Sequence, residues 1–302
     1  MARHAVSQHR RHEMHAVYGM IAPAVVLVTL FLIVPFLLAF VLSFTNERLI
    51  PRPIPTSFVG VRNYERVLVD EDFWQAFWNT FRFAFFVVPI QSGIALGLAL
   101  LIDSKLPGRN VFRGIFFTPT VITMVVVAII WAGLFRAPEG LLNSIVTFVS
   151  FGQAGPYDWL LDTRFALPMI MVMSIWQGAG FQMIIYLAGL QGINREMYEA
   201  ARIDGAGRWQ QFWYITMPAL RNTHIFVLVT TTILAFKLFA QIEVLTQGRP
   251  LGTTNTLVRY IYALGFKQQK VGLAAAAAVI FFVIVLAIAM VQRRLIREER
   301  AV

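Results

Sequence analysis

EAARIDGA, residues 199–206, is a charged segment that lies between two long apolar stretches of the sequence. Ahead of it, Asn194 is a suitable N-cap for a helix, and Glu196 is favourably placed in the first turn of that helix. Glycine readily takes the left-handed conformation in which helices end. The pattern therefore predicts a helix to about Ile203 and a break at Asp204-Gly205.

A second helix is predicted from Gly207 to about Tyr214, before Pro218 sets the entry into the next apolar stretch. Such a hairpin could simply join two membrane spans. Alternatively, its small side chains would suit a groove on a partner protein; these are Ala200, Ala201 and Ala206. The residues alone leave both interpretations open.

The composition indicates a membrane protein. Of 302 residues, 58% are hydrophobic and 14% are charged, whereas ordinary soluble domains are about 25% charged. The mean hydropathy is +0.65. The chain has no cysteine, which excludes disulfides and thiolate metal sites.

The apolar stretches predict an all-α, polytopic bundle of six transmembrane helices, because about 20 helical residues cross a bilayer core. The predicted spans are 17–44, 79–102, 111–135, 166–190, 225–245 and 272–291. The domain organisation that follows is a cytoplasmic tail at 1–16, a six-helix transmembrane domain at 17–291 and a cytoplasmic tail at 292–302. Aromatic residues at 73–78 are expected to form an amphipathic helix at the membrane surface.

Basic residues predict the orientation. With both termini inside, fourteen arginines and lysines fall on the inner side and ten on the outer side. The turn between the second and third spans, with Lys105, Arg109 and Arg113, argues most strongly for this arrangement. The loop at 191–222 is then cytoplasmic. Membrane topology accounts for the formal charge of +10 better than a nucleic-acid partner does.

Catalytic and metal-binding patterns are not apparent in the sequence. HEMH, at 12–15, is one residue short of the spacing that places two imidazoles on one helical face, and a basic tail is the simpler interpretation. There is no GxxxxGK[ST] segment to hold ATP phosphates and no Ser/His/Asp constellation. We expect neither catalytic nor metal-ligating residues.

The run EAARIDGAGRWQQFWYITMPAL, 199–220, resembles the EAA loop of bacterial ABC-importer permeases. The matching residues are Glu199, Ala200, Ala201, Asp204, Gly205, Ala206, Phe212 and Pro218. Similarity extends along the chain, including FVGVRNY at 58–64 and SIWQGAGFQM at 174–183. The pattern is similar to the sugar-type subgroup that includes maltose and glycerol-phosphate importers.

The resemblance implies a type I importer permease fold in the bacterial inner membrane and a path for a sugar or a related polyol or phosphate solute. It also implies that the 199–206 segment docks on a cytosolic ATPase, with Gly205 as the bend. The implied partners are a second, homologous permease in a heterodimer, two ATPase subunits, an extracytoplasmic solute-binding protein and membrane lipid. ATP and Mg would bind to the ATPases and not to this chain.

The chain departs from the family pattern at three places. Asn194 stands where a proline is usual, which is a conservative change at a helix start. Ala240 replaces an acidic residue, and Arg249 replaces the second glycine of a Thr-x-Gly-Gly-Pro turn. Roles of the last two positions in contacting solute or receptor do not carry over.

The solute path is predicted around Lys237, because an ionisable residue at membrane depth is a functional hypothesis by default. Gln241 is one helical turn further on, so both side chains are expected to face one cavity. Gln177, Gln182 and Trp176 in the fourth span could supply amide hydrogen bonds and an apolar platform for a sugar ring. Alternatively, Lys237 pairs within the bundle or with a partner permease, and the amides join helices.

Two other functional classes fit the sequence less well. A polytopic membrane enzyme should cluster His, Asp or Glu at one membrane face. An ion-coupled secondary transporter should carry carboxylates within its spans, and none of the predicted spans has an Asp or Glu at mid-depth. A transport subunit without catalytic chemistry of its own is the preferred prediction.

Overall fold

The computed structural model describes residues 18–50, 55–104 and 108–295. Within these ranges the chain is helical and has no strand, apart from one antiparallel bridge between Thr45 and Phe58. The all-α prediction is confirmed. Three predicted features lie outside the described residues. They are the tail at 1–16 with its histidines, the residue Lys105, and the end of the tail at 292–302.

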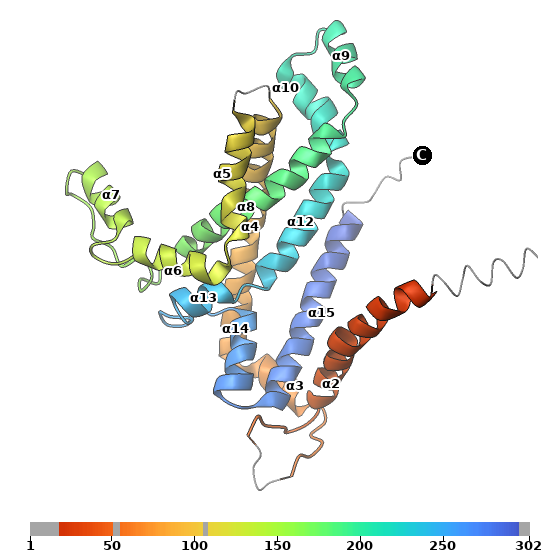
Figure 1. Cartoon of the computed structure of the whole chain (residues 1–302). Helices are drawn as coiled ribbons and strands as arrows, with labels where there is room; N and C mark the ends of the chain where they lie inside the picture. The colour runs from red at the N-terminus through yellow and green to blue at the C-terminus, as the bar shows by residue number, and fades with distance from the viewer. Residues whose placement is uncertain (1–17, 51–54, 105–107, 296–302) are drawn as a thin grey trace, which may run out of the picture. The chain divides into compact units, whose positions relative to one another are not determined.

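The described residues include five helical segments that are long and apolar enough to cross a membrane, one of which, Arg221–Leu245, is interrupted by a short break (Figure 1). They are Tyr18–Leu42, Glu71–Asp103, Ala166–Gln191, Arg221–Leu245 and Val271–Gln292. A sixth span is obtained if the bent pair α5 (Arg109–Val121) and α6 (Met124–Leu134) counts as one. This agrees with the predicted bundle.

The third predicted span, 111–135, is formed by two helices that meet at a sharp bend. The axes of α5 and α6 differ by 100°, with the break at Ile122 and Thr123. Pro119 lies in the last turns of α5 and cannot donate a backbone hydrogen bond there. At the break, Gln177 Nε2 donates to the Ile122 carbonyl oxygen at 3.1 Å, which satisfies an acceptor that a straight helix would have used.

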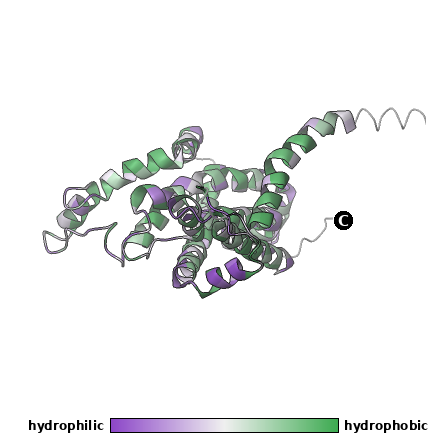
Figure 2. Ribbon diagram, turned by 90° about the horizontal axis from the view of Figure 1, so that it is seen from below, coloured by the Kyte–Doolittle hydropathy of each residue, from purple (hydrophilic) through white to green (hydrophobic). Residues whose placement is uncertain are grey.

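The chain divides into two compact units, the first comprising Met1–Val69 and Ala263–Ile280. In the described part of this unit, a helix over Tyr18–Leu42 contains a π-helical turn, η1 (Thr29–Ile33), and ends in α2 (Val34–Leu42). Its residues are apolar and exposed (Figure 2). The other elements are α3 (Arg62–Val69), η3 (Ala263–Lys267) and the start of α15 (Val271–Leu295).

The second unit comprises Asp70–Tyr262 and Phe281–Val302. Its described core joins α4 (Glu71–Asp103), α8 (Ala166–Gln191) and α12 (Arg221–Phe236) through apolar side chains. The largest cluster includes Phe83, Val87, Ile170, Phe236 and Ile242. These helices carry apolar residues on most sides, so burial between them rather than amphipathicity determines their packing.

The separate surface helix expected at 73–78 is not formed, because α4 begins at Glu71 and runs through this segment. The Asp70 carboxylate caps α4 by accepting from the Asp72 amide at 3.0 Å. Phe73 is 1% exposed and packs on Tyr260, with ring centroids 5.8 Å apart. The aromatic cluster therefore anchors the start of a span instead of lying flat on a membrane.

The loop between α6 and α8 is folded and includes α7 (Leu141–Val149). Asn143 organises it: its Nδ2 donates to the Tyr157 carbonyl oxygen, and its Oδ1 accepts from the Tyr157 amide and from Trp159 Nε1, each at 2.9 Å. Nearby, hydrogen bonds from Arg164 lower the pKa of the half-buried Asp162 carboxyl to about 2.

Candidate functional site

The 199–206 segment has the helix and the break that the sequence predicts. Helix α9 (Arg195–Ile203) starts at Asn194, whose Oδ1 accepts from the Glu196 amide at 3.0 Å. It ends in a left-handed residue, Gly205, at φ +81°. The Gly205 amide donates to the Arg202 carbonyl oxygen at 3.1 Å, and the Ala206 amide donates to that of Ala201 at 2.8 Å.

The helical stretch that follows the break is longer than predicted. Instead of one helix from 207 to about 214, α10 (Arg208–Gln211) continues into a π-helical turn, η2 (Phe212–Thr216), and then α11 (Met217–Ala219). Pro218 lies inside these turns. It is in the first turn of α11, where a missing backbone amide is tolerated.

Two side-chain contacts tie the halves together. The Tyr198 and Thr216 hydroxyls are 2.8 Å apart, and Gln211 Nε2 donates to the Ala206 carbonyl oxygen at 2.9 Å. Both contacts restrict the angle between α9 and the following helical turns. The sequence pattern does not indicate them, since they join positions five and eighteen residues apart.

Helix α9 has no buried residue, and it lies beyond the ends of α8 and α12 (Figure 1). Glu199, Ala200, Asp204 and Gly205 are exposed, and the remaining two predicted docking residues, Ala201 and Ala206, are half-buried. Large apolar side chains are exposed beside them; Ile203 is 87% and Trp209 is 72% exposed. An exposed apolar patch of this kind is typical of a protein-interaction surface.

The predicted solute path falls at a break in the fifth span. Helix α12 ends at Phe236, and α13 (Ala240–Leu245) starts after a short non-helical stretch. Lys237 is the first residue of the break; its side chain is exposed and, within the described residues, makes no hydrogen bond or ion pair. The argument that helical spacing brings Lys237 and Gln241 to one face is wrong, because no single helix contains both.

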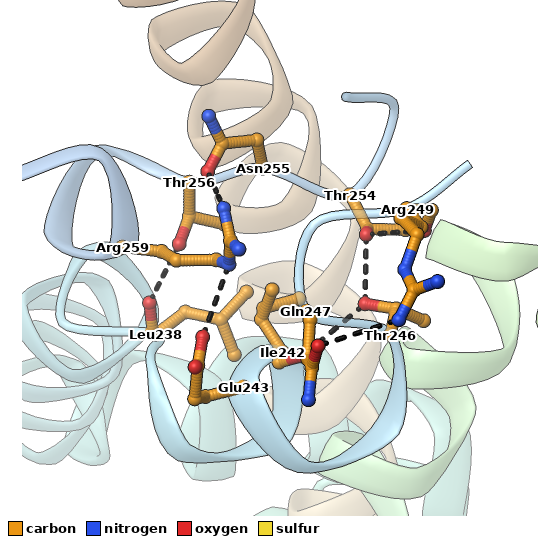
Figure 3. A network of polar contacts seen from close by, with 10 residues as sticks. All are labelled: Leu238, Ile242, Glu243, Thr246, Gln247, Arg249, Thr254, Asn255, Thr256 and Arg259. Carbon is orange, nitrogen blue, oxygen red and sulfur yellow. Dashed lines mark hydrogen bonds and ion pairs between the residues drawn. The ribbon is translucent and has the colours of Figure 1, made fainter. Parts of the chain in front are cut away.

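A polar network holds the break in place (Figure 3). The Thr256 hydroxyl donates to the Leu238 carbonyl oxygen at 2.9 Å, which satisfies an acceptor freed by the break. Arg259 Nε donates to a Glu243 carboxylate oxygen at 3.1 Å, and its Nη1 donates to Asn255 Oδ1 at 3.0 Å. The break is therefore a fixed feature of the fold. The sequence analysis did not identify Thr256 or Arg259.

The same network fixes the turn between α13 and α14 (Leu257–Tyr262). The Thr246 and Thr254 hydroxyls are 2.8 Å apart, and Thr254 also donates to the Arg249 carbonyl oxygen at 2.8 Å. The threonines at 246, 254 and 256 are the signal in the sequence that could have located this network.

Tyr260, on α14, lies beside the start of α4. Burial and a hydrogen bond to Asp70 raise the pKa of the Tyr260 hydroxyl well above its usual range.

The polar side chains of α8 mainly join helices. Gln177 is buried and bonded to the α5–α6 break, and Gln182 is buried and donates to the Thr231 hydroxyl of α12. Gln241 Nε2 reaches Ser174 Oγ at 3.4 Å, a long contact. Trp176 is 46% exposed and stacks obliquely on Trp131, with ring centroids 5.5 Å apart. Of the residues predicted for the path, Lys237 and Trp176 present the most accessible surface.

Metal ligands are not grouped in the described residues: no three His, Cys, Asp or Glu side chains come together as a metal site would require.

The family model described as "Binding-protein-dependent transport system inner membrane component" matches residues 91–300. The chain belongs to this family. The permease is 36% identical to the lactose transport system permease protein LacF of Rhizobium radiobacter, over 93% of each chain. It is 33% identical to the trehalose/maltose transport system permease protein MalF of Thermococcus litoralis, over 94% of each.

A solved structure shares the fold of the permease. A chain of a bacterial ABC transporter involved in the import of the acidic polysaccharide alginate matches with a TM-score of 0.82. The match covers 97% of this chain and 98% of that chain, at 24% sequence identity. The importer-permease fold is therefore confirmed. The protein is a multi-pass transport component of the inner membrane and not an enzyme.

Proposed function

We propose that this permease forms half of the translocation path of an ATP-driven importer for a sugar or small oligosaccharide. Three relatives with similarity over most of the chain support this solute class. Besides the lactose and trehalose/maltose permeases, the arabinooligosaccharides transport system permease protein AraP of Bacillus subtilis is 31% identical, over 93% of this chain and 88% of its own.

The observation that carries the proposal is the exposed α9 helix with its fixed break. In our proposal α9 and the turn at Glu199–Ala206 insert into a cleft of a cytosolic ATPase, which holds ATP and Mg. Closure of the ATPase pair would then move the spans as rigid bodies, because the contacts of Tyr198 and Gln211 hold α9 and its turn against the helical turns that lead into the fifth span. The apolar and small side chains would supply most of the contact energy, with Glu199 ordering the loop.

The remaining partners in the proposal are a second, homologous permease and an extracytoplasmic solute-binding protein. The loop at 191–222 and both termini would face the cytoplasm, with the tails at 1–16 and 292–302 flanking the permease domain at 17–291. An ion-coupled transporter or a membrane enzyme is not favoured by any feature of the described residues.

Purification of the tagged chain after mild solubilisation tests the proposal. We expect an ATPase and a second permease to co-purify with the tagged chain. When the purified complex is reconstituted in vesicles, we expect ATP-dependent solute uptake. Glu199→Lys should weaken ATPase retention and leave the amount of membrane-inserted permease unchanged. Uptake by this chain alone, without ATP, would refute the proposal.

Lys237 is proposed to donate to a hydroxyl, carboxylate or phosphate oxygen of the passing solute. Since a hydrogen bond from a charged group contributes about 1.5–3 kcal/mol, Lys237→Met should reduce uptake roughly tenfold or more. ATPase co-purification should be unchanged, and Lys237→Arg should retain most uptake. Normal transport by the methionine variant would instead favour a role for Lys237 in pairing with the second permease.

A further inference from the structure

A polar pocket of about 720 Å³ lies within the unit formed by Met1–Val69 and Ala263–Ile280. The ionisable side chains that line it are Arg48, Arg62, Arg66, Lys270 and Glu47. Among the described lining residues, four cations thus accompany one carboxylate. None of these residues belongs to the 199–206 segment proposed to dock on the ATPase or to the predicted solute path.

Most of this positive charge is not neutralised by the protein. Among the described residues, the guanidinium groups of Arg48, Arg62 and Arg66 make no hydrogen bond or ion pair. Arg62 and Arg66 are one turn apart on α3, a spacing at which like charges destabilise a helix. Lys270 Nζ donates to Gln268 Oε1 at 2.9 Å, and the Glu47 carboxylate accepts from the Thr56 hydroxyl. A bound anion would relieve this repulsion.

The backbone around the pocket is held by hydrogen bonds. Asn63 Nδ2 donates to the Ser43 and Thr45 carbonyl oxygens, both at 2.8 Å. The Gly272 amide donates to the Glu47 carbonyl oxygen at 3.0 Å, and the Leu49 amide to that of Gln269 at 3.1 Å. These bonds fix the segments that carry Arg48 and Lys270. A preorganised pocket loses less entropy when a ligand binds.

The pocket lies where a lipid headgroup would be. The Tyr18–Leu42 span has no buried residue in its most apolar window, so no other described part of this chain covers its apolar sides. Pocket residues begin at Thr45, three positions after this span, and Lys270 immediately precedes α15. Three residues of chain span at most about 10 Å, so the start of the pocket lies close to the headgroup layer, which adds about 5–8 Å to each side of the hydrocarbon core.

We propose that this pocket binds the phosphate of an anionic phospholipid. Arginine matches phosphate oxygens with two parallel N–H donors, and basic pockets between membrane helices bind acidic headgroups on the cytoplasmic side of membranes; the predicted orientation places the same chemistry on the outer side here. A docking protein would instead require a broad surface of about 800 Å². A soluble phosphate shares the recognised chemistry, but the depth of the pocket favours the lipid. The proposal does not depend on the transported solute or on ATPase coupling.

Native mass spectrometry of the delipidated full-length chain tests this site, with dioleoylphosphatidylglycerol and dioleoylphosphatidylcholine as probes. We expect tighter binding of phosphatidylglycerol, and about a fivefold loss of that affinity in each of Arg62→Gln and Arg66→Gln. Arg136→Gln is the matched control, because Arg136 is exposed and does not line the pocket. It should bind phosphatidylglycerol as the unaltered chain does.

Three outcomes would overturn the assignment. The first is equal binding of the two lipids by the unaltered chain. The second is an equal loss of affinity in Arg136→Gln, which would show attraction to net charge without a site. In the third, inorganic phosphate binds in an Arg66-dependent manner while phosphatidylglycerol fails to displace it, which assigns the pocket to a soluble anion. Both α3 substitutions replace exposed residues, and unchanged thermal midpoints without lipid would confirm that the variants are folded.

Discussion

Replacing Gly205 by proline should abolish ATP-driven uptake while the permease still inserts in the membrane. Gly205 has φ +81°, whereas proline is fixed near −65°, and proline would also remove the amide that donates to Arg202. A conformational cost of about 3 kcal/mol lowers the population of the observed turn conformation roughly a hundredfold. The measurements are solute uptake in cells and retention of the ATPase on the tagged permease.

Gly205→Asn is the matched control, because asparagine tolerates the left-handed region far better than other side chains do. The space around Gly205 is open, because a Cβ atom added there has no heavy atom within 4 Å beyond its chain neighbours. We expect Gly205→Asn to retain uptake and Gly205→Ala to be intermediate. If Gly205→Pro transports normally, the turn is not the coupling element. If Gly205→Asn fails as completely as proline, the partner contacts the glycine surface itself.

The helix α9 and its break could be predicted because their determinants are local. Asn194 caps the helix within its own first turn, and Gly205 ends it without help from distant residues. The number of spans was also predictable, since length and hydropathy determine it. In each case the signal lies within one helix or one turn.

The breaks in the third and fifth spans could not be predicted in the same way. The break at Lys237–Phe239 depends on Thr256, which is eighteen residues from its acceptor Leu238. The bend at Ile122 depends on Gln177, fifty-five residues away. Membrane helices are apolar on most sides, so periodicity gives little information about which side chains meet. The placement of the path residues consequently required the tertiary structure.

Substitution of Gly180 on α8 should have a second large effect, on both the stability of the permease and its uptake activity. A side chain at this position would overlap the backbone carbonyl oxygen of Phe116, because α5 crosses α8 there at backbone distance. The contact lies one turn from Gln177, whose amide holds the α5–α6 bend. Even Gly180→Ala should therefore displace α5, destabilise the protein by about 1–3 kcal/mol and reduce uptake. Gly180→Leu should prevent correct packing altogether.

Gly114→Ala on α5 separates this steric effect from helix propensity. Nothing lies within 4 Å of the added methyl group at Gly114, and alanine is the better helix former by about 0.5–1 kcal/mol. The same chemical change should thus raise or preserve the thermal midpoint at Gly114 and lower it at Gly180. Equal midpoints for the two variants would mean that α5 can shift without cost. In that case the hydrogen bond between Gln177 and Ile122, and not the close crossing, would be what maintains the bend.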